Sequence, residues 1–197
     1  QTKPWSYDMP MPDIVRKGAL REAIASARAA LTAEQWAADD AERTRHVLAA
    51  VDEFPAGTAS VYLSLPGEPD TSGIIDGLTE RGWRVLVPKL RRSPDWGWFT
   101  GWDDLTPGWA GIPQPSSRLG AEALTEANLI LLSSLAVGRD GTRLGTGGGW
   151  YDRALAHRRS DALLVALSRA DEVLDTIPSE PHDVSIHGYA TERGWVV

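Results

Sequence analysis

The chain has 197 residues, of which 42% are hydrophobic and 24% are charged, and it contains no cysteine. Such a composition is typical of a globular protein with a sizeable core, and the lack of cysteine excludes disulfides, thiolate zinc sites and cysteine nucleophiles. The net charge of −7 argues against nucleic-acid binding, because a phosphate backbone requires a basic surface. The sequence also contains no uncharged run that is long enough to suggest a membrane span.

The first part of the chain differs in character from the remainder. Residues 1–12 contain three prolines and no apolar stretch of the kind found in secretory signals. We therefore expect an extended arm there, followed by one domain over residues 13–197, and we expect the protein to reside in the cytoplasm.

A first helix is predicted over residues 13–31. Apolar side chains recur there at helical spacing, and Asp13 is the predicted N-cap. Lys17, Arg21 and Arg28 fall within about 40° of one another on an adjoining face of this helix. A basic face of this kind could also be solvated without any binding role.

A second helix is predicted to follow directly. Thr32 and Gln35 form the T-x-x-Q pattern of a capping box, and the helical pattern runs to about Val51. The two helices together predict an N-terminal helical hairpin.

Apolar runs and turn residues divide the remaining chain into strands and helices. Thr71 should cap a helix, Gly82 should end it, and Asp140-Gly141 should form a turn. Short strands and a loop are expected in the tryptophan-rich residues 95–115, and short extended pieces in residues 178–197. The predicted strands cover residues 60–65, 84–87, 129–137 and 163–167, and the predicted helices cover residues 71–81, 121–127 and 150–159.

Strand, helix and strand thus alternate along the chain. This order predicts an α/β fold of three layers, in which a mostly parallel sheet carries helices on both faces. Ligands of such sheets gather beyond the carboxyl ends of the strands, and the glycine-rich residues 145–149 fall in this zone.

The glycine-rich segment is Gly145-Thr146-Gly147-Gly148-Gly149. Its glycines let the backbone approach a ligand and turn several N–H groups toward one point, and the following helix would add its positive end. The segment therefore suits phosphate, although it is neither a Walker loop nor a dinucleotide fingerprint. A flexible connection between a strand and a helix stays open as the alternative.

The residues beside this segment favour a binding role. Arg143 precedes the glycines and suits a phosphate, whereas Asp152 follows them and suits Mg²⁺. Trp150 and Tyr151 offer flat surfaces for an aromatic ligand, or they pack in the core.

Residues 141–152, GTRLGTGGGWYD, resemble the hallmark G-x-R-L-G-x-G-x-G-Y-Y-D of the 5-formyltetrahydrofolate cyclo-ligases, also called 5,10-methenyltetrahydrofolate synthetases. Further segments resemble the family in the same order, and the resemblance covers nearly the whole domain. These segments are Lys17-x-x-Leu20-Arg21, LSLPGEPDT at residues 63–71, IPQP at residues 112–115 and PHD at residues 181–183.

The resemblance implies a reaction and its ligands. A cyclo-ligase closes 5-formyltetrahydrofolate to 5,10-methenyltetrahydrofolate with ATP and Mg²⁺, and it releases ADP and phosphate. Such an enzyme mainly has to align two small molecules and neutralise phosphate charge. Folate and ATP are thus the expected partners, with neither nucleic acid nor membrane among them.

The resemblance also implies roles for individual residues, with Lys17 and Arg143 taking part in catalysis. The residues implied for ATP and its phosphates are Lys17, Arg21, Arg143, Gly145, Thr146, Gly147, Gly148, Gly149, Trp150 and Tyr151. Those implied for folate are Leu63, Glu68, Gly147, Gly148, Trp150 and Tyr151, with Trp109 beside them or in the core. Asp152 and Asp183 would hold Mg²⁺, although Asp183 by itself could be a cap and Glu68 a polar loop residue.

The chain departs from the family pattern at several positions. Val137-Gly138 stands where many relatives carry Phe-Asp, Ser134 replaces a proline, and Thr146 replaces a larger residue. His187 stands where an aspartate is often found. The missing aspartate at position 138 would be expected to weaken the metal or phosphate site.

These departures keep other functions open. One is a folate- or nucleotide-binding protein of the same fold that has lost turnover. Another is a different enzyme on the same open sheet, such as a relative of sugar-phosphate isomerases or acyl-CoA transferases, because a fold does not determine a function.

Overall fold

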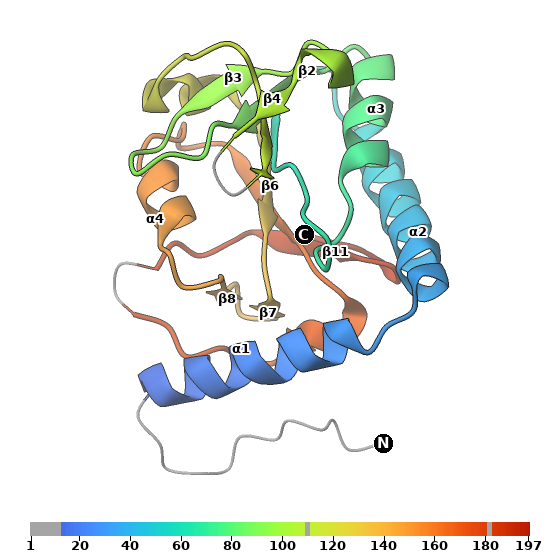
Figure 1. Ribbon diagram of the computed structural model, residues 1–197, viewed down its shortest axis with the longest axis vertical. Coiled ribbons are helices and arrows are strands. Elements are labelled where there is room, and N and C mark those ends of the chain that lie inside the picture. Colours follow the sequence, from blue (N-terminus) through green and yellow to red (C-terminus); the bar gives the residue numbers. More distant parts are fainter. Residues whose placement is uncertain (1–12, 109–110, 181–182) are drawn as a thin grey trace.

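The computed structural model describes residues 13–108, 111–180 and 183–197 (Figure 1). The predicted arm of residues 1–12 lies outside these ranges, as do Trp109 and the first two residues of the PHD segment. Among the helices in these ranges, none is long and apolar enough to cross a membrane.

A seven-stranded sheet organises the fold, in the order β12-β11-β9-β6-β1-β2-β3. Its inner strands run parallel to one another, whereas β3 and β12 pair antiparallel at the two edges. The predicted α/β class with a mostly parallel sheet is therefore confirmed. The strands are β1 (Thr58–Val61), β2 (Arg84–Pro88), β3 (Trp96–Trp98), β6 (Leu129–Ser133), β9 (Leu163–Leu167), β11 (Gly188–Thr191) and β12 (Gly194–Val196).

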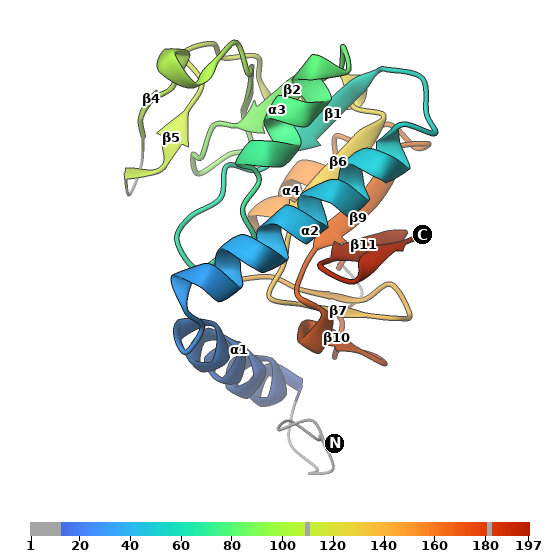
Figure 2. The same ribbon diagram turned by 90° about the vertical axis from the view of Figure 1, so that its right-hand side faces the viewer.

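Alternate side chains of the central strands contribute to two buried clusters. Along β2, Val85 and Val87 belong to one cluster and Leu86 to the other, as expected where successive residues point to opposite faces. Helices α2 (Ala33–Val51) and α3 (Ser72–Glu80) cover the first cluster. Helix α4 (Trp150–Leu155) and the 3-10 helix η3 (Ala121–Glu126) cover the second. Figure 2 shows α2 and α3 together in front of the sheet.

Helix α1 (Asp13–Ala29) lies across one end of the sheet, next to β7 and β8 in Figure 1. Its stripe of Leu20 and Ile24 packs on Ala136, Leu144 and Ile177 in a small separate cluster. Helix α2 instead contacts α3, β11 and β12. The structure thus does not confirm the predicted hairpin, because the two helices pack on different parts of the molecule.

The capping predictions have different outcomes. Thr32 and Gln35 form both halves of the predicted capping box, and α2 ends at Val51 as expected. Thr71 occupies the N-cap position of α3, as predicted, but it makes no side-chain cap hydrogen bond, and its Oγ1 donates to the carbonyl of Tyr62 at 2.7 Å. Asp13 is itself the first residue of α1.

The apolar run at residues 129–137 is two strands rather than the single predicted one. Its first half is β6 of the central sheet, and its end is β7 (Ala136–Gly138). Strand β7 pairs with β8 (Arg143–Leu144) and β10 (Val173–Leu174) in a second, three-stranded sheet. The chain therefore leaves the central sheet at the carboxyl end of β6, where ligands are expected.

Short elements complete the structure. The tryptophan-rich segment contains β3, the 3-10 helix η1 (Trp102–Asp104) and a two-stranded sheet of β4 (Thr106–Pro107) and β5 (Pro113–Gln114). A further 3-10 helix, η4 (Ala170–Glu172), precedes β10. Helix α4 is shorter than the predicted 150–159.

Candidate active site

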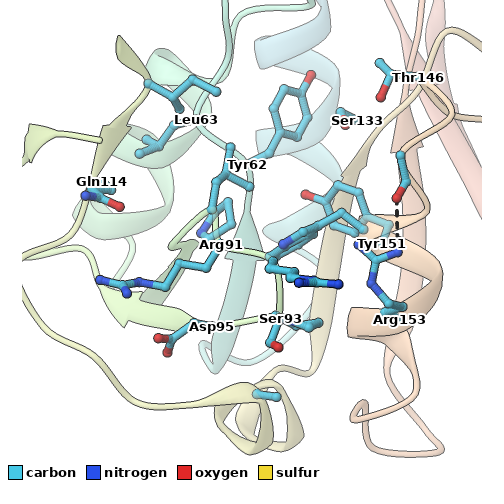
Figure 3. A pocket seen from close by; sticks show the side chains of 18 of the residues that line it. Tyr62, Leu63, Arg91, Ser93, Asp95, Gln114, Ser133, Thr146, Tyr151 and Arg153 are labelled. Carbon is cyan, nitrogen blue, oxygen red and sulfur yellow. Dashed lines mark hydrogen bonds between the residues drawn. The ribbon is translucent and has the colours of Figure 1, made fainter. Parts of the chain in front are cut away.

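Two adjoining cavities lie at the carboxyl ends of β1, β2 and β6. The larger has a volume of about 1300 Å³ and the smaller about 320 Å³. Figure 3 shows Leu63 and Gln114 on one side of the larger cavity, and Tyr151 and Arg153 on the opposite side. The residues that line both cavities are Ser133, Thr146, Gly148, Trp150 and Tyr151.

The smaller cavity collects the residues predicted to hold phosphate and metal. Basic side chains from α1 and β8 meet the glycine-rich segment there. Gly147 has a φ of +104° and Gly149 a φ of +61°, conformations that favour glycine. The predicted residues in its wall are Lys17, Arg21, Arg143, the five residues 145–149, Trp150, Tyr151, Asp152 and Asp183.

The basic side chains of α1 are tied to this wall. Lys17 is only 8% exposed, and its Nζ donates to Asp183 Oδ2 at 2.9 Å. Arg21 Nε donates to the carbonyl of Gly145 at 2.9 Å. Because both side chains make specific contacts and Lys17 is buried, the alternative of a solvated helix face is wrong for this part of α1.

Arg143 lies at the base of the same cavity, with 6% of its side chain exposed. Its Nη2 donates to Asp152 Oδ1 at 3.1 Å, and its Nε is buried without a hydrogen-bond partner among the described residues. A buried cation beside a polar cavity favours an anionic ligand, because a ligand oxygen would complete its hydrogen bonds.

Asp152 and Asp183 share this cavity, so their carboxylate oxygens could serve a cation such as Mg²⁺, which prefers hard oxygen ligands. Each carboxylate already accepts from a basic side chain, Arg143 or Lys17. In the described ranges, no group of three or more histidine, cysteine, aspartate and glutamate residues could hold a metal. A metal here would therefore need further oxygens from phosphate and water.

The predicted folate residues lie in the larger cavity. Leu63 and Glu68 come from the segment after β1, and Trp150 and Tyr151 form the wall shared with the smaller cavity. Gly147 was also predicted to contact folate, but it lines the smaller cavity only. Trp109 lies outside the described residues.

Glu68 is held in place by its own turn. Its Oε2 accepts from the backbone N–H of Leu65 at 2.9 Å, and its backbone N–H donates to the Leu65 carbonyl. Burial raises the pKa of Glu68 above the usual glutamate value, although this hydrogen bond and the charge of Arg28 act in the opposite direction. The carboxylate can accept hydrogen bonds from the N–H edge of a pterin-like ring.

Trp150 and Tyr151 form the wall between the cavities. Their rings meet edge to face with centroids 5.2 Å apart, and the Arg143 guanidinium lies 5.8 Å from the Tyr151 ring. Burial raises the pKa of Tyr151, so its hydroxyl stays protonated at neutral pH and can donate. Trp150 Nε1 is buried and has no hydrogen-bond partner in the part of the chain that the structure describes.

Sequence reasoning missed several lining residues. Ser133 ends β6, and Arg91 and Arg92 follow β2, so the rule that ligands lie beyond carboxyl ends could have found all of them. Tyr62 follows β1 in the same way, and Gln114 lies in the IPQP segment, whereas Arg118 gave no comparable signal in the sequence.

The departures from the family pattern lie away from these cavities, with the exception of Thr146, which lines both. Gly138, Ser134 and His187 line neither one. His187 Nδ1 accepts from the backbone N–H of Leu164 at 2.9 Å, and Ser134 Oγ donates to the Leu167 carbonyl at 2.8 Å. The expectation that the missing aspartate at position 138 weakens the site therefore has no support in this geometry.

Comparison with known proteins identifies the same family that the sequence motifs resemble. The model of the 5-formyltetrahydrofolate cyclo-ligase family matches residues 13–192. A 5-formyltetrahydrofolate cyclo-ligase of Mycolicibacterium smegmatis is 38% identical over 147 residues, which are 71% of this chain and 76% of that protein. One from Haemophilus influenzae is 28% identical over 85% of this chain and 92% of that protein.

Solved structures agree on the fold. The 5,10-methenyltetrahydrofolate synthetase of Aquifex aeolicus superposes with a TM-score of 0.74 at 22% identity, over 91% of each chain. The synthetase of Mycoplasma pneumoniae gives a TM-score of 0.71 at 19% identity, over 89% of this chain and 98% of that one. With the family model spanning nearly all of the described residues, the chain belongs to the 5-formyltetrahydrofolate cyclo-ligase family.

Proposed function

We propose that this protein converts 5-formyltetrahydrofolate and ATP into 5,10-methenyltetrahydrofolate, ADP and phosphate. The observation that carries the proposal is the shared wall of the two cavities. A cavity with phosphate-binding chemistry and a larger, mostly apolar cavity meet at Trp150 and Tyr151, so a phosphate and a folate would meet there.

The chemistry requires such a meeting point. A formamide oxygen is a poor leaving group, so the γ-phosphoryl group of ATP is first transferred to the formyl oxygen and ADP leaves. N10 of the folate then attacks the activated formyl carbon, closes the ring and loses its proton, and the oxygen departs with the phosphate. Alignment and charge neutralisation supply most of the catalysis in phosphoryl transfer.

Lys17, Arg21 and Arg143 would neutralise the phosphates in this reaction. Their charged hydrogen bonds to phosphate oxygens are stronger than neutral ones, and the amides of residues 145–149 would add donors from the backbone. Arg143 has a buried Nε without a partner among the described residues, so its guanidinium keeps a donor that a phosphate oxygen could accept from.

Asp152 and Asp183 are the residues that would hold Mg²⁺, directly or through water. The ion, held there, would supply positive charge that offsets the charge of the ATP phosphates. The carboxylates would then exchange their present partners, Arg143 and Lys17, for the ion, and the two basic groups would turn to the phosphates.

Glu68 would orient the folate through hydrogen bonds to the N–H groups at the edge of its ring system. Leu63 would pack against the ring, and Trp150 and Tyr151 would flank it at the reacting end. The Tyr151 hydroxyl at the shared wall would donate to the formyl oxygen and point it toward the smaller cavity.

One assay tests the proposal. The purified protein is mixed with Mg²⁺, ATP and 5-formyltetrahydrofolate, and the methenyl product is followed by its near-ultraviolet absorbance, with a reaction lacking ATP as the control. Product that forms only with ATP supports a cyclo-ligase. If both ligands bind and no product forms, the protein is instead a folate- or nucleotide-binding protein of the same fold. If neither ligand binds, the protein is a different enzyme with this fold.

A further inference from the structure

The larger cavity carries positive charge at a place that the proposed reaction leaves unused. Arg91 and Arg92, from the segment after β2, line it together with Arg118. Arg153 of α4 also reaches this cavity, but its Nη1 donates to the Gly148 carbonyl at 3.0 Å. Figure 3 shows Arg91 on the same side as Gln114, away from Thr146 of the glycine-rich segment.

This charge is not compensated within the protein. Arg91 and Arg92 are exposed, and neither forms a hydrogen bond or an ion pair with any residue in the described ranges. Arg118 has a partner, because its Nε donates to Asp95 Oδ2 at 2.7 Å. Arg91 and Arg92 therefore leave a positive charge at this cavity, although the net charge of the chain is −7.

The segment that carries the two arginines is anchored at its base. It connects β2 to β3, which pair antiparallel with Pro88 opposite Trp96. The backbone N–H of Lys89 donates to the Asp95 carbonyl at 2.8 Å and closes the base of the connection. The buried Lys89 Nζ donates to the Pro115 carbonyl at 2.8 Å and to those of Ser116 and Ser117 at 3.3 Å.

The position of the reacting atoms indicates which part of a ligand would reach these arginines. If the formyl group lies at the wall of Trp150 and Tyr151 and the ring edge lies at Glu68, the rest of a folate must extend through the larger cavity. A folate ends in a glutamyl group, whose carboxylates are negatively charged at neutral pH. Guanidinium groups match carboxylates in both charge and planar geometry.

We propose that Arg91 and Arg92, supported by Arg118, bind the glutamyl carboxylates of the folate tail. This inference rests on the proposed function and names the part of the substrate that the open end of the larger cavity recognises. A tail with several γ-linked glutamyl residues carries more carboxylates, so it binds more tightly than a tail with one.

The experiment is a thermodynamic cycle in which both the protein and the ligand change. Titration calorimetry without ATP measures the Kd of 5-formyltetrahydrofolate and of 5-formyltetrahydropteroate, which has the same ring system but no glutamate. The unmodified protein and the Arg91→Ala/Arg92→Ala variant are compared. Loss of the glutamate should weaken binding to the unmodified protein by about tenfold, since charged hydrogen bonds at an exposed rim are of moderate strength. It should leave the Kd of the variant nearly unchanged.

Two further measurements identify the source of the effect. A triglutamyl substrate should bind the unmodified protein more tightly than the monoglutamyl form, and the variant should not distinguish them. The Kd of ATP should be the same in both proteins, because a weaker Kd for ATP would assign the arginines to nucleotide phosphates instead. Arg193→Ala is the matched control, since Arg193 is 81% exposed at its side chain and lines neither cavity.

The outcomes separate the two proposals. If the variant and the unmodified protein lose the same factor on removal of the glutamate, the tail site is refuted, even where the protein converts folate. If the unmodified protein binds neither folate nor pteroate, the proposed function fails and the tail site fails with it.

Discussion

At the scale of single residues, the candidate site depends on charged groups that are buried beside a cavity. Lys17 and Arg143 are largely removed from water, yet each is paired with a carboxylate at about the distance of a normal hydrogen bond. A buried charge is costly when it is not paired. The pairs therefore stabilise the folded site, and they also hold the basic groups where phosphate would bind.

Arg143→Ala removes the guanidinium predicted to face the transferring phosphate. We expect kcat/KM to fall by more than about tenfold, which corresponds to about 1.4 kcal/mol in the barrier, because a charged contact is lost. Steady-state kinetics in the methenyl assay measures this, with Arg139→Ala as an exposed control. An unchanged rate would contradict the role of Arg143.

Glu68→Gln tests the folate pocket through pH. Since burial raises the pKa of Glu68, its carboxyl is protonated at a higher pH than an ordinary glutamate, and it then stops accepting on both oxygens. The folate KM of the unmodified protein should rise as the pH falls through that pKa. The variant should have a higher folate KM that does not depend on pH over the same window, with kcat little changed.

The same shift has a consequence for stability. A carboxyl whose pKa is raised by folding binds its proton more tightly in the folded state than in the unfolded chain. Its contribution therefore becomes less favourable as the pH rises through the raised pKa. The free energy of unfolding of Glu68→Gln, measured in urea at several pH values, should lack this pH-dependent contribution. An identical pH dependence in both proteins would count against a buried carboxyl.

At the scale of elements, contacts between distant segments hold the site together. Arg28 of α1 donates to Glu172 Oε1 at 2.6 Å and to Glu172 Oε2 at 2.8 Å, and both residues are buried. It also donates to the carbonyl of Gly67 at 3.2 Å, next to Glu68, and to that of Ser134 at 2.9 Å. The helix that carries Lys17 and Arg21 is thereby joined to the segment that carries Glu68.

Arg28→Met would leave Glu172 buried without its charge partner. We expect the free energy of unfolding to fall by about 3–5 kcal/mol, the usual cost of breaking a buried ion pair from one side. Urea denaturation measures this. The double variant Arg28→Met/Glu172→Gln should regain part of the loss, and no recovery would indicate that packing rather than charge is responsible.

Gly138→Asp restores the residue found in many relatives and tests the β7–β8 connection. A Cβ atom at this position would collide with Thr142 Oγ1 and with the Asp140 carboxylate, which already accepts from Thr142 and Thr176. We expect a loss of stability of about 1–3 kcal/mol, as for other overpacked sites. The KM values for folate and ATP should not fall, and a lower KM for either ligand would show that the missing aspartate matters for binding.

At the scale of the whole molecule, much of the fold was predictable because local signals and tertiary contacts agree. The capping box at Thr32 and the apolar run of β9 depend on neighbouring residues, and both were predicted correctly. The break between β6 and β7 was not predictable, because residues 129–137 are apolar throughout and only pairing partners separate the two strands.

The candidate site also has one part that local sequence predicts and one part that depends on tertiary contacts. The hallmark at residues 141–152 identified the smaller cavity, since its residues are close in sequence. The larger cavity is built from segments after β1, β2 and β5, which are far apart in the sequence and meet only in the folded structure. Arg91 and Arg92 are thus invisible to motif reasoning, although they follow a strand that was predicted.

Ligand binding should stabilise the whole molecule in a way that depends on the metal. At a hundredfold excess of ATP over its Kd, a single site adds about 2.7 kcal/mol to the free energy of unfolding. We expect a smaller rise in Tm when a chelator removes Mg²⁺, because Asp152 and Asp183 would then repel the phosphates without a metal ion between them. Equal shifts with and without Mg²⁺ would contradict the assignment of the two carboxylates.

Helix α1 has a consequence for how the protein loses activity. It supplies two predicted phosphate ligands, yet among the described residues its buried apolar side chains, Leu20 and Ile24, belong to a small cluster with Ala136, Leu144 and Ile177. Elements with few apolar contacts tend to open locally at a lower free energy than the central strands. We expect hydrogen exchange of the α1 amides to be faster than that of β6 and β9, and inactivation on warming to precede the melting of the sheet.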